Sequence, residues 1–473
     1  MDKLGSGAER QEREHAAGLA RGGALAVPFL GLLAALQMSV IGINDQVLPT
    51  IAGDLGIVGT GLVAAASVAS IAAAATVISA GLLADRVGRR RVLIAGLLIG
   101  TLGCVLTAIA PTAAVYFAAQ VLAGVGFGTV FGASFAYVSA VAPTGKVSSA
   151  LGVFGASFAV VSLVILFIAE ALPASGGRLE FFVPAVVAVV GAVLVPAVLQ
   201  VVSGHSSTSS DWLGHLLLVG GIGSVLLGLS QVGAPGWALI PLTVGVALLL
   251  SFYLVESKAS HAFFPTTLFE TPTFLAAVLA GLIYSFGFAA AMLSARLLWP
   301  FLAAEETTDL SVWQLPLGIG MIAGAFITGR RMSAFTAVRS ALFFGAMLTA
   351  VGLVALAAAS RESSVLACLP GLVLTGAGAG AVSVPFGYLV IRSAPSTAFG
   401  PVTGVRVAVG EFGYAFAVAL TALVMSRLTI GDGMSHALTV TLGIAALVVL
   451  VAGVAAAYLL RGTDSEQAAV PRA

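Results

Sequence analysis

Long apolar stretches dominate this sequence and limit what it can fold into. Hydrophobic residues make up 59% of the 473 residues and charged residues only 9%, against roughly 25% charged in soluble domains. A water-soluble fold cannot bury that much apolar surface, so we predict an all-α polytopic membrane protein. With about 20 apolar residues per span, the sequence predicts fourteen transmembrane helices, at 24–46, 58–83, 91–110, 113–141, 147–171, 180–202, 212–231, 237–255, 273–302, 312–330, 335–359, 364–392, 401–427 and 435–460.

The distribution of lysine and arginine predicts the orientation of these spans. With the N-terminus in the cytoplasm, Arg178, Arg361 and Arg427 fall on the outer side, and Arg296 and Arg406 fall within spans. The other 16 of the 21 Lys and Arg residues then lie on the cytoplasmic side, which agrees with the positive-inside rule. We therefore expect both termini in the cytoplasm.

An internal repeat relates two distant parts of the chain. Residues 122–128 (Leu-Ala-Gly-Val-Gly-Phe-Gly) have a counterpart in residues 374–380 (Leu-Thr-Gly-Ala-Gly-Ala-Gly), 252 positions later. The same offset relates Ala142-Pro143 to Ala394-Pro395 in the loops that follow, and Gly152-Val153 to Gly404-Val405 in the next helices. Because the offset holds through a helix, a loop and the next helix, we predict two parallel halves of six helices each, with the fourth and fifth spans equivalent to the twelfth and thirteenth.

Six helices per half leave two extra spans between Asp211 and Glu256. This pattern predicts a cytoplasmic disordered tail at 1–22, an N-terminal six-helix bundle at 23–203, a linker with two extra helices at 204–262, a C-terminal six-helix bundle at 263–461 and a cytoplasmic tail at 462–473.

One charged segment, residues 81–91, joins the second and third predicted spans. It reads Gly-Leu-Leu-Ala-Asp-Arg-Val-Gly-Arg-Arg-Arg. Gly88 suits a backbone position with positive φ, and Asp85 among arginines should be ionised and paired. A topological anchor alone would need basic residues, but not an aspartate or glycines at fixed spacing.

This segment matches without a gap the G-x-x-x-D-R-x-G-R-R signature between helices 2 and 3 of the major facilitator superfamily. With its two extra spans, flanked by Asp211-Trp212-Leu213-Gly214, the chain resembles the fourteen-span drug:proton antiporter branch. The resemblance implies a major facilitator fold, no enzyme activity, and export of small lipophilic or cationic compounds such as drugs and antibiotics by alternating access. It also implies a cytoplasmic gate formed by Gly81, Asp85, Arg86, Gly88, Arg89 and Arg90.

Ionisable groups within the bilayer are costly, so each is a functional candidate. Glu411 lies ten residues, or about 15 Å, inside the thirteenth predicted span, where burial favours the protonated carboxyl. We take it as the first candidate for a proton carrier, the alternative being a structural carboxylate neutralised by an arginine. Asp45, Arg406 and Arg296 are further candidates. Asp45 is equally well explained as a helix-end charge, and Arg296 as a cavity cation, a partner of a carboxylate or a side chain that reaches the outer surface.

The departures from the family bear on proton coupling. The branch usually carries an aspartate at the position of Val40 and an arginine at the position of Gln120. Its antiporter motif in the fifth helix is missing from residues 152–163. If protons are coupled, another group must carry them, and Glu411 is the expected substitute.

We expect the ligand between the two halves, in a cavity suited to a lipophilic, cationic or aromatic molecule. None of the five histidines pairs at ligand spacing within a span, so we expect no metal. We also expect no cofactor, the proton gradient as energy source, a small lipophilic substrate and membrane lipid as partners, no nucleic acid, and a monomer in the bacterial inner membrane. The candidate cavity residues are Gln37, Asn44, Gln120, Tyr284, Phe288, Tyr388 and Tyr414.

Two other interpretations stay open, and a third lacks the residues that it would need. A lipid or metabolite permease that is not coupled to protons fits the altered residues at 40 and 120. A non-transporting membrane sensor would have the same topology. A membrane-embedded enzyme would need an intramembrane His and Asp pair or a nucleophile with its base, and the sequence has neither.

Overall fold

The computed structural model describes residues 5–58, 60–142, 147–171, 178–201, 212–232, 236, 238–258, 266–302, 310–332, 335–361, 365–393, 399–428 and 433–461. At some helix positions within these ranges, Asp85, Arg86 and Arg296 among them, the description covers the backbone only.

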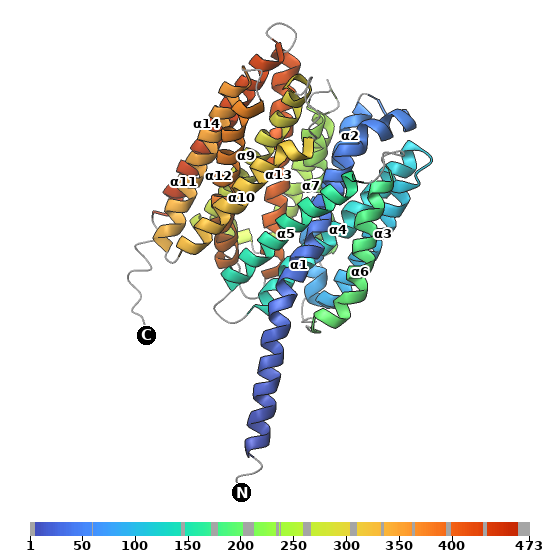
Figure 1. Cartoon of the computed structure of the whole chain (residues 1–473), viewed down its shortest axis with the longest axis vertical. Helices are drawn as coiled ribbons and strands as arrows, with labels where there is room; N and C mark the ends of the chain where they lie inside the picture. Colours follow the sequence, from blue (N-terminus) through green and yellow to red (C-terminus); the bar gives the residue numbers. More distant parts are fainter. Residues whose placement is uncertain are drawn as a thin grey trace.

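The described chain is almost entirely helical, and its helices pack side by side in one bundle (Figure 1). Two short 3-10 helices, η1 (Leu179–Phe181) and η2 (Thr266–Glu270), precede α6 and α9. The α-helices are α1 (Gly5–Leu55), α2 (Thr60–Val87), α3 (Arg89–Ala108), α4 (Ala113–Val141), α5 (Val147–Glu170), α6 (Phe182–Val198), α7 (Trp212–Ser230), α8 (Leu239–Glu256), α9 (Pro272–Leu302), α10 (Leu310–Arg331), α11 (Phe335–Ala359), α12 (Val365–Ser393), α13 (Phe399–Leu428) and α14 (Gly433–Leu459).

Within the described residues, twelve helices are long and apolar enough to cross a membrane. Helices α2 and α10 are not among these twelve, and the described part of α2 includes an apolar segment at Ala64–Val77. The predicted all-helical membrane architecture is confirmed, whereas the count of fourteen spans stays a prediction.

The N-terminal tail predicted at 1–22 overlaps the beginning of α1, and its assignment as a tail stays a prediction. Helix α1 begins at Gly5 and continues without a break to Leu55, and its first turns extend away from the bundle (Figure 1). Residues 8–17 are rich in Ala, Glu, Gln and Arg, which have high helix propensity. No proline precedes Pro28, so nothing in the sequence stops a helix that packing has nucleated further along.

A single residue connects α2 to α3. Gly88 follows the last residue of α2 and precedes the first residue of α3, and its φ is 109°. Side chains disfavour that backbone conformation, whereas glycine adopts it without steric cost. The positive φ predicted for Gly88 is therefore confirmed, and it lets the charged segment reverse direction within one residue.

The internal repeat is visible in matching helices. Adding 252 to the bounds of α4, 113–141, gives the bounds of α12, 365–393. Packing follows the same offset, because Gly128 of α4 lies against Ala73 of α2, and Gly380 of α12 lies against Met321 and Ala325 of α10. The packed pair α2 and α4 in one part of the chain is thus equivalent to the packed pair α10 and α12 in the other.

Two hydrophobic cores fill the bundle. One is formed by residues of α1 to α6, and the other mainly by residues of α7 and α9 to α14. We refer to helices α1–α6 as the first half, to α9–α14 as the second half, and to the contact between them as the seam. Across the seam, α2 packs against α13 and α5 packs against α10. Helix α7 packs against both α2 and α13, and α8 packs against α7.

Candidate functional site

A buried carboxyl lies at the seam, hydrogen-bonded to the opposite half. Glu411 is the thirteenth residue of α13 and only 8% exposed. Gln37 of α1, 2% exposed, donates from Nε2 to Glu411 Oε1 at 3.3 Å. Among the described residues, Gln37 is the hydrogen-bond partner of this carboxyl. The structure thus brings two of the candidate residues together, one from each half.

Arg406 lies on the same helix as Glu411 but contacts other groups. Its guanidinium carbon is 4.8 Å from the ring centre of Phe135 on α4 and 5.4 Å from that of Phe386 on α12. Both distances are within the range of cation–π attraction, about 6 Å. Five residues of an α-helix turn by about 140°, which explains why Arg406 and Glu411 face different neighbours. Tyr284 of α9 is within electrostatic range of both.

A second polar cluster lies within the first half. Asn44 Oδ1 accepts hydrogen bonds from the hydroxyl of Tyr116 and from Gln120 Nε2, the latter at 2.9 Å. Asn44 Nδ2 donates to the backbone oxygen of Ala65 at 3.0 Å. Asn44 and Gln120 are buried. This amide therefore joins α1, α2 and α4 at one point.

We expect Asn44→Leu to destabilise the protein. Leucine has about the right volume but leaves the Tyr116 hydroxyl and Gln120 Nε2 without their acceptor, and each unsatisfied buried donor costs about 1–3 kcal/mol. Thermal unfolding of the purified protein in detergent measures the effect. Gln46→Leu is the matched control, because Gln46 Oε1 has no partner among the described residues. Equal melting temperatures for the two variants would contradict the assignment.

The remaining candidates are more dispersed. Tyr284, Phe288, Tyr388 and Tyr414 are partly buried and pack against the core of the second half. Tyr388 accepts a hydrogen bond from Arg392 Nη1 at 3.1 Å, near the end of α12. Asp45 is partly buried on α1, and its charge acts on Tyr116 of α4.

The gate candidates are described only in part. Gly81 is buried, and Gly88, Arg89 and Arg90 are partly exposed around the connection between α2 and α3. The side chains of Asp85 and Arg86, like that of Arg296, lie outside the described residues. The pairing predicted for Asp85 therefore stays a prediction.

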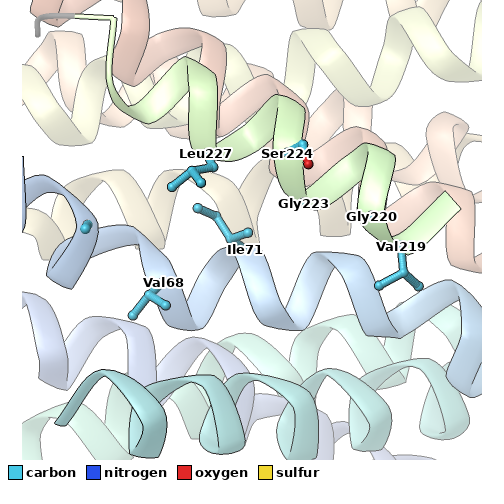
Figure 2. A pocket seen from close by; sticks show the side chains of 8 residues that line it. Val68, Ile71, Val219, Gly220, Gly223, Ser224 and Leu227 are labelled. Carbon is cyan, nitrogen blue, oxygen red and sulfur yellow. The ribbon is translucent and has the colours of Figure 1, made fainter. Parts of the chain in front are cut away.

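Two spaces lie on opposite sides of α2. A narrow void lies on the inner side, with Gln37, Ala69, Ala73 and Phe127 in its lining, and it has no room for a water molecule. On the other side, a groove of about 340 Å³ separates α2 from α7 (Figure 2). The groove is lined by Ala64, Val68, Ile71, Val219, Gly220, Gly223, Ser224 and Leu227.

Three side chains of the site were not among the predicted residues. Tyr116 lies four residues before Gln120 on α4, so the helical spacing could have placed both on one face. Phe135 and Phe386 have no comparable signal, because their role depends on where Arg406 of another helix points.

Comparison with known proteins agrees with this architecture. The sequence profile of the Major Facilitator Superfamily matches residues 29–417. A multidrug resistance protein B homolog of Mycobacterium tuberculosis (strain ATCC 25618 / H37Rv) is 28% identical over 333 residues, which is 68% of this chain and 61% of that protein. The chain thus spans less than two thirds of this relative's length. Multidrug transporter protein MdtP of Bacillus subtilis (strain 168) is 24% identical over 405 residues, covering 84% of this chain and 74% of that one.

Among solved structures, the crystal structure of the human organic anion transporter MFSD10 (TETRAN) is similar with a TM-score of 0.66. The alignment covers 91% of this chain and 98% of that one at 15% identity, so the likeness shows the fold. Fold and profile together define a multi-pass membrane transporter rather than an enzyme. The chain belongs to the Major Facilitator Superfamily.

Proposed function

We propose that this transporter exports small lipophilic or cationic compounds by alternating access, driven by proton antiport. The observation that carries the proposal is the carboxyl of Glu411, buried at the seam between the halves and hydrogen-bonded across it. A carboxyl at that position can meet either aqueous side as the halves rock, as a proton carrier must. The two relatives named as multidrug proteins support the class of substrate.

One carboxyl can couple proton and substrate by competition. Burial favours the protonated form of Glu411, whereas a bound cation favours the carboxylate. Substrate binding therefore releases the proton, and proton binding releases the substrate, which is the exchange that antiport requires. We expect the rings of Tyr284, Phe288, Tyr388 and Tyr414 to contact a bound lipophilic cation through their faces.

The proposal also covers the energy source, the oligomeric state and the membrane location of the transporter. It needs no cofactor beyond the proton gradient, no metal and no nucleic acid, and it works as a monomer surrounded by membrane lipid. Bacterial relatives support a bacterial inner membrane, and the lysine and arginine distribution supports cytoplasmic termini.

Accumulation of a fluorescent lipophilic cation in inverted membrane vesicles with an acidic lumen tests the proposal. We expect accumulation in vesicles that contain the protein, and its loss when a protonophore collapses the gradient. Accumulation that survives the protonophore would favour a lipid or metabolite permease without proton coupling, which the altered residues Val40 and Gln120 also suggest. Absence of any transport across a panel of lipophilic amines and lipids would favour a sensor.

A further inference from the structure

Gln37 has one hydrogen-bond acceptor that is left unsatisfied beside Glu411. Its Nε2 donates to Glu411 Oε1 at 3.3 Å, whereas its Oε1 is buried and has no hydrogen-bond partner among the described residues. The void that borders Gln37 has no room for a water molecule. A buried carbonyl oxygen without a donor carries a penalty in free energy, so a donor at this point would stabilise the contact.

A protonated Glu411 supplies that donor. A neutral carboxyl has one O–H donor and one carbonyl acceptor, and a primary amide has an N–H donor and a carbonyl acceptor in one plane. The two groups can form a closed pair, with Gln37 Nε2–H donating to Glu411 Oε1 and Glu411 Oε2–H donating to Gln37 Oε1. An ionised carboxylate only accepts hydrogen bonds. Loss of the proton therefore removes one of the two bonds and leaves two acceptor oxygens, Glu411 Oε2 and Gln37 Oε1, next to each other without a proton between them.

We propose that Gln37 is the positioning residue that links protonation of Glu411 to contact between the two halves. The inference rests on the proposed function, because it takes Glu411 as the proton carrier. Gln37 belongs to α1 and Glu411 to α13, so the two-bond pair joins the halves while the carboxyl holds its proton. Release of the proton weakens the pair and allows α1 and α13 to separate at this depth.

Other ionisable groups lie on α13 and on the helices that pack against it, and none with a described side chain has a hydrogen bond to Glu411. Tyr284 of α9 lies within its electrostatic range, and Arg406 of α13 faces Phe135 and Phe386 instead. Asp45 lies eight residues beyond Gln37, about 12 Å along α1. Helices α2, α4, α7, α12 and α14 also pack against α13, and their titratable or charged residues with described side chains are Tyr116, Tyr137, His215, Cys368, Tyr388, Arg392, His436 and Tyr458.

Two measurements on the purified protein separate proton binding from movement of the halves. The infrared carboxyl band that is present in wild type and absent in Glu411→Gln reports protonation of Glu411. Distances between pairs of spin labels, one label on each half, report how far the two halves are separated at the seam. One label pair, at Val58 and Leu366, follows the ends of α1 and α12, and the other, at Val201 and Tyr458, follows the ends of α6 and α14. All four positions are exposed, while Cys104 and Cys368 are buried and should not be labelled.

We expect acidification of wild type to raise the carboxyl band and to shift at least one label distance with the same midpoint. In Gln37→Leu the band should still respond to pH, whereas the shift in distance should disappear. Glu411→Gln places a second amide opposite Gln37, and two amides form the same closed pair at every pH. Its label distances should therefore stay, at every pH, at the values that wild type shows at acidic pH. Adding Gln37→Leu to this variant should move the distances away from those values.

The controls separate failure of the inference from failure of the proposed function. Gln46→Leu removes an amide from the same helix and should behave as wild type. Should Gln37→Leu not fold, Gln37→Asn keeps an amide that is one methylene too short and should give the same loss. A distance shift of wild-type size in the Gln37 variants overturns the role of Gln37 and leaves Glu411 as the carrier. A carboxyl band that never responds to pH in wild type overturns both.

Discussion

Glu411→Gln is expected to abolish gradient-driven accumulation of a lipophilic cation in inverted vesicles, down to the level of vesicles without the transporter. Glutamine has nearly the same volume as glutamate and can still accept the hydrogen bond from Gln37 Nε2, so the protein should fold. It cannot bind or release a proton. The resemblance implies that Val40 and Gln120 replace the aspartate and the arginine usual in the antiporter branch, so we expect no second group to replace it.

Exchange of substrate against substrate provides the control for this variant. Dye exchange at equal concentrations on both sides needs no net proton movement, so it should continue in Glu411→Gln. Asp45→Asn is the matched variant, because it removes another carboxyl, partly buried on α1, and we expect a milder loss. Gradient-driven transport at the wild-type rate in Glu411→Gln would exclude Glu411 as the carrier and favour a permease without proton coupling.

The second large effect is expected from Gly380→Val on stability. Gly380 lies where α12 packs on α10, and a Cβ at this position would meet the backbone oxygen of Met321 and, at 2.9 Å, the backbone nitrogen of Ala325. A helix backbone cannot move aside as the end of a side chain can, so the two helices must separate. Overpacking costs about 1–3 kcal/mol, and occasionally more. Thermal unfolding in detergent should show a clear decrease in melting temperature or too little folded protein to purify.

Gly443→Val is the matched control for that substitution. Gly443 lies in α14, and a Cβ there would meet no atom within 4 Å. The change in helix propensity is the same for both variants, so the difference between their melting temperatures isolates the contact between α12 and α10. If both variants melt at the same temperature, the close approach of these helices contributes nothing to stability.

Much of the fold could be predicted because its signals are local or periodic. Helices follow from apolar stretches of sufficient length, the positive φ of Gly88 from its place between charged residues, and the equivalence of α4 and α12 from one offset of 252. The number of spans stays a prediction, because twelve helices within the described residues are long and apolar enough to cross a membrane and α2 and α10 are not among them. The boundaries of the domains and tails stay predictions, except that residues 5–22 are helical.

The candidate site was less accessible to sequence reasoning. The depth of Glu411 follows from counting residues along α13, but the direction of its side chain does not. Both α1 around Gln37 and α13 are apolar on nearly every face, so the helical period does not show which face meets which partner. Hence the two candidates could be named separately, while their hydrogen bond across the seam could not be predicted. The cluster around Asn44 was more readable, because Tyr116 and Gln120 are one turn apart on α4.

Helix α7 makes the two contacts between the halves, α2 with α13 and α5 with α10, different from each other. It packs against α2 of the first half and α13 of the second half, with α8 on its outer side, whereas α5 and α10 meet directly on the other flank. A motion that parts α2 from α13 must therefore make α7 slide along one of them, and the groove between α2 and α7 (Figure 2) is where such sliding would change the shape presented to lipid. Parting α5 from α10 carries no such requirement among the described helices. We therefore expect the two halves to separate more readily between α5 and α10 than between α2 and α13, where α7 packs against both.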